Sequence, residues 1–353
     1  MFNYNIHDLV RVQSNKPLTR LNRFAVDSLG GVKPDIVVVF GSFTPDLTGY
    51  KKIRKCWIGD HSLYCKDHYK LCFFELWLRN IDSEQTTINF SGDPIFSNEI
   101  FYVLIFEPYL TYVFSRKNTL FLHSSSVSSK GKGVLVSGKT GIGKTTTLLS
   151  FLPQKAVKYF SDDQTIVNGH TLYSYPMPIG LQYGIVKHSK LLLRPIDALY
   201  ILFYSVVNKV TFNYGHLTRR VLVKDIGFDD DGIMGKFFMK TPQVGDAAPL
   251  NFVFILMLGE KPDVTRLTPD EAFEELKNNN MKNEDKQKLI FRFFSKYQQV
   301  YPNFKYWEHF DRILKNFSEE NIRFYKVSLS KRYDLKAVFP RVLDISRGDG
   351  LND

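Results

Sequence analysis

The sequence predicts an α/β protein in two parts: a larger C-terminal region built on a mixed β-sheet, and a smaller α/β region before it. Three observations support this prediction. At residues 133–152 an apolar strand runs into a glycine-rich turn and then into a helical segment. Short apolar runs at 35–43 and 250–258 are typical of buried strands. The longer segments 97–117, 267–279 and 284–301, whose apolar residues recur at helical spacing or cover most faces, are typical of helices.

Length and composition set the scale of the fold. The chain has 353 residues, 44% of them hydrophobic, which is enough for one large or two ordinary domains. We expect a first domain at 1–117 and a second at 118–345. The longest apolar run, residues 248–258, is far shorter than the ~20 residues of a membrane span. With no signal-peptide pattern and only three cysteines, we expect a reducing, cytoplasmic setting and no membrane partner.

The first region reads as mixed α/β. DIVVVFGSF at 35–43 predicts a strand that ends at a glycine turn. The alternation at 61–78 predicts a pair of strands. Residues 97–117 predict a helix that is apolar on most faces and therefore buried, linking this region to the next.

The second region predicts strands before and after the glycine turn. Residues 119–138 read as strand, turn and strand, and 158–176 as two short strands around Asn168-Gly169, a hairpin signal. A strand at 250–258 follows. Thr268-Pro269-Asp270 marks the start of a helix over 267–279, and a further helix is expected at 284–301 with a late strand at 321–330.

The glycine turn matches the phosphate-loop pattern G-x-x-x-x-G-K-[ST], and a strand before it and a helix after it provide the context that the pattern requires. Glycines let the backbone wrap closely around an anion, and the amides of the loop and helix N-terminus point at phosphate oxygens. In this pattern the lysine reaches the β- and γ-phosphates and the next hydroxyl binds Mg²⁺. The predicted nucleotide-binding residues are Gly138, Lys139, Thr140, Gly141, Ile142, Gly143, Lys144, Thr145 and Thr146.

Asp162 and Asp163 follow Lys144 by 18 and 19 residues, just after a short strand. One carboxylate at such a place can hold Mg²⁺, and a second can accept a proton from an attacking hydroxyl. Thr145, Asp162 and Asp163 are therefore the candidate metal ligands. Taken without the upstream loop, the same pair reads as a solvated acidic turn.

A third segment, FLHSSSV, places His123 fifteen residues before Gly138. Together, this segment, the glycine loop and the S-D-D run resemble the HPr kinase/phosphorylase family and, more distantly, the ATP-dependent phosphoenolpyruvate carboxykinases. The resemblance covers about residues 119–340 and is specific over 122–166. The sequence departs from the family at Thr140 and Thr145, where serines are usual, and at 177–195, where the E-x-R-G-x-G signature is missing.

The resemblance implies an HPr-kinase-like phosphate-loop domain that uses ATP and Mg²⁺. His123, Lys144, Asp162 and Asp163 would be its catalytic residues, with His123 beside the phosphates. One aspartate would be the general base and the other a metal partner; which is which stays open. The family forms hexamers, which makes a homo-oligomer possible. Arg219, Arg220 and Arg332 are candidates for an additional cation, with surface charge as the alternative role.

The expected activity is transfer of the γ-phosphate of ATP to a hydroxyl, by family precedent a serine of a protein or peptide. An RNA hydroxyl, as in a structured RNA such as tRNA, and a small-molecule hydroxyl are alternatives. A nucleotide-hydrolysing switch without a phospho-acceptor is a competitor of another class.

Charge and two local clusters bear on these alternatives. The net charge of +11 divides into +2 over residues 1–118 and +9 over 119–353. Residues 286–315 interleave seven Lys and Arg with aromatic residues, a pattern that suits RNA binding or amphipathic helices with an aromatic core face; we favour the helices.

Cysteines and histidines crowd into residues 56–72, but their spacing lacks a zinc knuckle, so we expect core and surface residues there.

Overall fold

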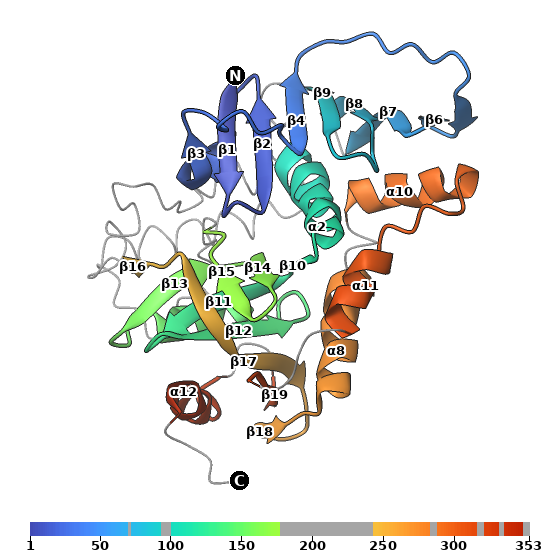
Figure 1. The fold of residues 1–353 in the computed structure, drawn as a ribbon. Coiled ribbons are helices and arrows are strands. Elements are labelled where there is room, and N and C mark those ends of the chain that lie inside the picture. Colours follow the sequence, from blue (N-terminus) through green and yellow to red (C-terminus); the bar gives the residue numbers. More distant parts are fainter. Residues whose placement is uncertain are drawn as a thin grey trace, which may run out of the picture. The chain divides into compact units, whose positions relative to one another are not determined.

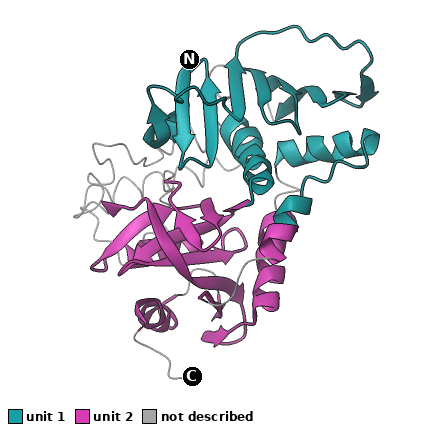
Figure 2. Cartoon of the chain, viewed as in Figure 1, with its two compact units in different colours: residues 1–118, 282–311 teal, residues 119–281, 312–353 magenta. Residues whose placement is uncertain are grey.

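The computed structural model describes residues 1–69, 72–92, 100–176, 243–282, 288–315, 321–331 and 335–348. It confirms a mixed α/β fold with mixed β-sheets (Figure 1). The chain forms two compact units, one made of residues 1–118 and 282–311 and the other of residues 119–281 and 312–353 (Figure 2). The chain thus leaves the first unit once and returns to it later, for a segment that the sequence analysis assigned to the second domain.

Within the described part of the first unit, nine strands form one sheet in the order β3-β1-β2-β4-β9-β8-β7-β6-β5. Neighbours pair antiparallel except β2 with β4 and β4 with β9, which are parallel. The predicted strands at 35–43 and 61–78 correspond to β4, β7 and β8. The strands are β1 Phe2–Ile6, β2 Val10–Ser14, β3 Ala25–Val26, β4 Ile36–Phe40, β5 Lys51–Ile53, β6 Cys56–Gly59, β7 Ser62–Tyr69, β8 Cys72–Arg79 and β9 Thr86–Gly92.

Helices bury aromatic side chains against this sheet. After the short 3-10 helix η1 (Thr19–Phe24), the predicted helix of 97–117 appears as a π-helical segment, η2 (Phe101–Phe106), that continues into α2 (Glu107–Arg116). Every residue of α2 except Arg116 is buried, in keeping with its apolar faces. Helix α10 (Leu289–Val300) belongs to the same unit because its apolar face packs there: the ring of Phe293 is tilted against Phe74, and that of Phe294 meets Tyr109 edge to face.

The cysteines of this unit depart from the expectation. Cys56 and Cys65 stand directly opposite each other on β6 and β7 and form a disulfide, while Cys72 is free and buried. From their spacing we expected core and surface residues in a reducing setting. Antiparallel pairing brings two opposed Cβ atoms within bonding reach, which sequence spacing alone does not reveal.

The second unit is built around the long strand β17 (Ala247–Leu258). Its first residues pair with β15, and its later residues pair in parallel with β12 on one side and β19 on the other. β17 therefore joins the group β10-β14-β15 to the group β16-β13-β11-β12, with β19 and β18 beyond it. The other strands are β10 Thr119–Leu122, β11 Ser124–Ser129, β12 Lys132–Gly138, β13 Val157–Ser161, β14 Thr165–Asn168, β15 Thr171–Tyr173, β16 Gln243–Val244, β18 Asp263–Arg266 and β19 Arg323–Leu329.

Helices α3 (Lys144–Phe151) and α12 (Phe339–Arg347) contribute to the apolar core of the second unit, where the rings of Phe151 and Phe339 lie 5.2 Å apart. Helix α8 (Pro269–Lys277) begins where predicted, with a capping box between Thr268 and Glu271, and continues into the π-helical segment η4 (Asn278–Lys282). Helix α11 (Glu308–Lys315) contains the border between the units. Within the described ranges no helix is both long and apolar enough to cross a membrane.

Candidate active site

Strand register brings the predicted site residues to one end of β12. Strand β12 ends at Gly138, and its antiparallel neighbour β11 begins opposite it, with Ser124 paired to Ser137. Strand β13 pairs with the other edge of β11, Ser126 opposite Ser161, so that β13 ends beside the start of β11. His123 and the Asp162-Asp163 pair are therefore placed next to the glycine loop by the sheet itself, although they are distant in sequence.

The loop between β12 and α3 has the backbone that its glycines permit. Gly138, Gly141 and Gly143 have φ values of 155°, 78° and 128°, in the region that L-residues rarely adopt. A Cβ at Gly138 would also lie 2.9 Å from the carbonyl oxygen of Leu256. Any side chain at Gly138 would therefore distort the loop or push it off β17.

The other residues of the predicted binding segment differ in how far they are exposed to solvent. Lys139 and Thr140 are exposed in the loop. Ile142 and Thr146 are buried, and Ile142 belongs to the apolar core of the unit. The Ile142 side chain thus packs the loop against the apolar core of the unit.

Lys144 is the first residue of α3, and it is 8% exposed. Its Nζ donates a hydrogen bond to the carbonyl oxygen of Gly138 at 2.8 Å and lies 3.0 Å from Nε2 of His123. The ammonium group therefore lies between the carbonyl of the first loop residue, Gly138, and the imidazole of His123. These contacts hold the lysine side chain beside the loop.

Asp162 is buried and faces two hydroxyl groups. Its Oδ1 accepts a hydrogen bond from Ser125 Oγ at 2.5 Å, and Thr145 Oγ1 lies 3.2 and 3.1 Å from its two oxygens. Burial raises the pKa of this carboxyl, and the charge of Asp163 adds to the rise. The hydroxyl of Ser125 counteracts the rise, and Thr145 and Lys144 do so to a lesser extent. Burial and the charge of Asp163 outweigh these contacts, so the ionised carboxylate is under-compensated by its neighbours.

Asp163 has a different environment. Its side chain is 51% exposed, and its Oδ1 lies 3.1 Å from Nδ1 of His123, in ion-pair range but off the direction of a hydrogen bond. Its carbonyl oxygen accepts the amide of Ser124 at 3.2 Å. Asp163 also has a φ of 80°, in the left-handed region that aspartate and asparagine tolerate better than other residues with a Cβ.

Sequence reasoning assigned no role to two residues at this site. Ser125 belongs to the HSSSV run and lies on β11, whereas His123 lies at the bend before that strand, so strand alternation does not place the two side chains together. Asn280 is the second: its Oδ1 accepts the backbone N–H of His123 at 2.5 Å. It stands 157 residues from His123, and no local pattern points to it.

Several expectations fall outside the described residues. The candidate cations Arg219, Arg220 and Arg332 are among them, as is the segment 177–195 in which the family signature was sought. Among the described residues, the predicted histidine, lysine, threonine and aspartates are brought together, so the site can be assessed from these five side chains.

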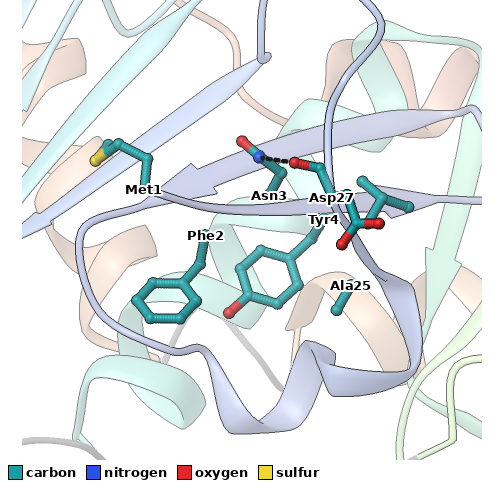
Figure 3. Close-up of a pocket in the computed structure, with 7 residues that line it drawn as sticks. Met1, Phe2, Asn3, Tyr4, Ala25 and Asp27 are labelled. Atoms are coloured by element: carbon teal, nitrogen blue, oxygen red, sulfur yellow. Dashed lines mark hydrogen bonds between the residues drawn. The ribbon is translucent and has the colours of Figure 1, made fainter.

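A surface pocket elsewhere is a poor alternative site. A cavity of about 580 Å³ lies along β1 and β3 of the first unit, lined by Met1, Phe2, Asn3, Tyr4, Ala25, Val26 and Asp27 (Figure 3). Asn3 Nδ2 donates to the carbonyl oxygen of Asp27 at 3.1 Å, so that its amide is already engaged. The lining has one carboxylate and no cationic side chain, which does not suit a phosphate.

Comparison with known proteins adds no relative to these observations. No protein-family model matches the chain, and no curated protein matches it.

Proposed function

We propose that the protein is an ATP- and Mg²⁺-dependent phosphotransferase that phosphorylates a hydroxyl group, with a serine of a protein or peptide as the acceptor. The observation that supports this proposal is the convergence of Lys144, Thr145 and Asp162 with Asp163 and His123 at the end of β12. A glycine loop with a lysine is sufficient for binding phosphates. Two carboxylates in different environments beside it are what phosphoryl transfer additionally needs.

Thr145 and Asp162 fit a divalent cation. The Thr145 hydroxyl on α3 lies 3.2 and 3.1 Å from the two carboxylate oxygens of Asp162, which follows β13. Mg²⁺ prefers such hard oxygen ligands, usually one or two carboxylates together with substrate phosphates. When bound, Mg²⁺ would neutralise developing charge on the transferred phosphoryl group. The buried, under-compensated carboxyl of Asp162 is the group that a cation would stabilise most.

The two aspartates then take separate roles. Asp162 is turned to the Thr145 hydroxyl and is assigned to the metal. Asp163 is half-exposed, so an acceptor hydroxyl can approach it, and it is assigned as the general base. His123 lies between Asp163 and Lys144 and keeps the base close to the phosphate-binding lysine. Lys144 would exchange its bond to the Gly138 carbonyl for a phosphate oxygen.

The RNA alternative rested on two observations: the basic excess of residues 119–353 and the interleaved basic and aromatic residues of 286–315. The structure removes the second. In the interleaved segment 286–315, the side chains of Phe291, Phe293, Phe294, Tyr297, Phe304 and Phe310 are buried. They form an aromatic core of amphipathic helices, and buried rings cannot stack on bases. The basic excess of residues 119–353 remains as the reason to test an RNA acceptor. A nucleotide-hydrolysing switch would use the same loop without an acceptor.

The proposal is tested by transfer of labelled γ-phosphate from ATP with Mg²⁺ into a fractionated lysate. The wild type is run beside Lys144→Ala and Asp163→Asn. Each substitution should lower transfer by roughly a hundredfold or more, because one removes charge stabilisation at the phosphates and the other removes the base. Lys155→Ala, at an exposed lysine of the α3–β13 connection, is the matched control and should leave transfer unchanged.

The fate of the label separates the alternatives. Label in protein that depends on Lys144 and Asp163 supports the proposal. Label in nuclease-sensitive material would replace the protein acceptor by RNA, and label in small molecules would replace it by a metabolite hydroxyl. Hydrolysis of ATP without any labelled acceptor would remove the kinase assignment in favour of the switch.

A further inference from the structure

Asn280 connects the candidate active site to the π-helical segment after α8. It lies in η4 and is 2% exposed. Its Oδ1 accepts the backbone N–H of His123 at 2.5 Å, and its Nδ2 donates to the carbonyl oxygen of Leu276 at 2.7 Å. π-helical turns are rare and often occur at functional sites. A buried asparagine whose two amide atoms both have partners is thus placed directly behind the candidate histidine.

The orientation of this amide is determined by its partners. Only the oxygen can accept the N–H of His123, and only the nitrogen can donate to the carbonyl of Leu276. A flipped side chain would put like groups against each other at both ends, with two buried polar groups left unpaired. The side chain is therefore held in one orientation, and its two hydrogen bonds link η4 to the backbone at His123.

This hydrogen bond matters because His123 lies at a bend between two strands, outside the pairing of either strand. β10 ends at Leu122 and pairs with β14, whereas β11 begins at Ser124 and pairs with β12. The backbone N–H of His123 is bonded to Asn280, and the next one, of Ser124, to the carbonyl of Asp163. These two bonds set where the imidazole lies relative to Lys144 and Asp163.

We propose that Asn280 is a positioning residue of the candidate active site: it holds the backbone of His123 so that the imidazole stays between the phosphate-binding Lys144 and the base Asp163. The catalytic part of this inference rests on the proposed function. Asn280 touches neither substrate nor reacting atoms. It acts only through His123, at the fixed distances of 3.0 Å to Lys144 Nζ and 3.1 Å to Asp163 Oδ1.

Asn280→Ser is the sharpest variant. A helical serine can still donate to the carbonyl four residues before it, so the bond to Leu276 has a replacement, while the shorter side chain no longer reaches His123. Asn278→Ser is the matched control. Asn278 is the same residue type in the same segment, and within the described residues its Oδ1 has no hydrogen-bond partner.

The first readout is independent of catalysis. Amide hydrogen exchange at His123 in the full-length protein should be at least about tenfold faster in Asn280→Ser than in the wild type, because the N–H loses its acceptor. In Asn278→Ser the exchange should be unchanged. Equal exchange at His123 in wild type and Asn280→Ser would overturn the inference. Asn280→Asp is the second variant, for use if Asn280→Ser fails to fold. It keeps an acceptor for the N–H of His123 and should retain wild-type protection at that amide. Faster exchange at His123 in Asn280→Asp would count against the inference.

The second readout is steady-state transfer. Asn280→Ser should lower kcat by roughly tenfold to a hundredfold with KM for ATP within about twofold, since misplacement of a catalytic group lowers rate more than binding. In a His123→Ala background the same change should have less than about a twofold effect on kcat. An equal loss with and without His123 would show a general structural role and overturn the inference.

The two readouts also separate this inference from the proposed function. A wild-type protein that transfers no phosphate removes the proposed function, and the exchange result alone then decides whether Asn280 holds His123. A wild-type protein that transfers phosphate, with an Asn280→Ser variant of unchanged kcat, keeps the proposed function and overturns the positioning role.

Discussion

Asp162 and Asp163 are consecutive residues, yet their carboxylates face opposite surroundings. One is buried against the hydroxyls of Ser125 and Thr145, and the other is half-exposed beside His123. A turn with a positive φ at Asp163 separates the two directions. Such a separation lets neighbouring groups of the same type carry out different tasks, because the environment sets the pKa and the access of each.

The burial of Asp162 has a stability consequence. A raised pKa means that the folded state keeps the proton longer than the unfolded state, so stability present at low pH is lost as the pH rises above the ordinary value of 3.8. At pH 7 and without ligands, we expect the Asp162→Asn protein to have a higher melting temperature than the wild type. The increase should be roughly 2–4 °C for each kcal/mol by which the free energy of unfolding rises. Thermal unfolding between pH 4 and 8 measures it, and the difference should shrink toward pH 4.

Addition of Mg²⁺ and ATP should reverse that order. Ligands that bind only the folded protein stabilise it by mass action, and the wild type retains the carboxylate that the cation needs. The melting temperature of the wild type should rise more than that of Asp162→Asn. An Asp162→Asn variant that melts lower than the wild type at every pH without ligands would contradict the account of an under-compensated buried charge.

At the scale of elements, the disulfide between β6 and β7 makes a second stability prediction. Cys56 and Cys65 close a short loop, and the loop-entropy account assigns such a cross-link about 2–3 kcal/mol. Reduction with dithiothreitol should therefore lower the melting temperature of the first unit. A Cys56→Ser/Cys65→Ser variant is the control and should melt at the same temperature with and without reductant. A wild type that is insensitive to reductant would show that the pair is not cross-linked in solution.

Local elements could be predicted from the sequence where neighbours in the chain determine the structure. The strand, glycine loop and helix at 132–151 follow from local pattern, as does the capping box at Thr268. The disulfide could not be derived, because it depends on the register of β6 against β7, and three cysteines leave the pairing open. The π-helical start of the predicted helix at 97–117 was also missed, since periodicity does not separate π from α geometry over one turn.

The candidate site divides in the same way. Lys144 and Thr145 belong to a contiguous motif, and the aspartates follow one strand later, so these were named from the sequence alone. Ser125 was not, because His123 lies at the bend before β11 and strand alternation does not relate the two side chains. Asn280 was not either, because its contact with His123 depends on how a helical segment far along the chain lies against the sheet. Tertiary contacts between single side chains carry no signature in local sequence.

At the scale of the whole molecule, the unit assignment of residues 282–311 is the largest departure from the sequence reading. The apolar face of α10 is needed by aromatic residues of the first unit: Phe294 lies 5.9 Å from Tyr109 and 5.4 Å from Tyr112 between ring centres. We expect a fragment of residues 1–118 to lack a cooperative unfolding transition, because these rings would be exposed.

Circular dichroism melting of that fragment, alone and with an added peptide of residues 282–311, measures the effect. The peptide should restore a transition, and a scrambled peptide of the same composition is the control. A fragment of 1–118 that unfolds cooperatively by itself would show that the returning segment is dispensable.

The divided first unit also imposes an order on synthesis. The ribosome releases the sheet of residues 1–92 long before it releases α10, and the whole segment from 119 to 281 emerges between them. Domains generally fold as they emerge, N-terminal first. Here the part that is made first must wait, with aromatic surface uncovered, until residue 300 has left the exit tunnel. The second unit's sheet likewise stays open until β19 has been translated. We therefore expect the N-terminal sheet to be the part of the nascent chain that is longest without its partner helix.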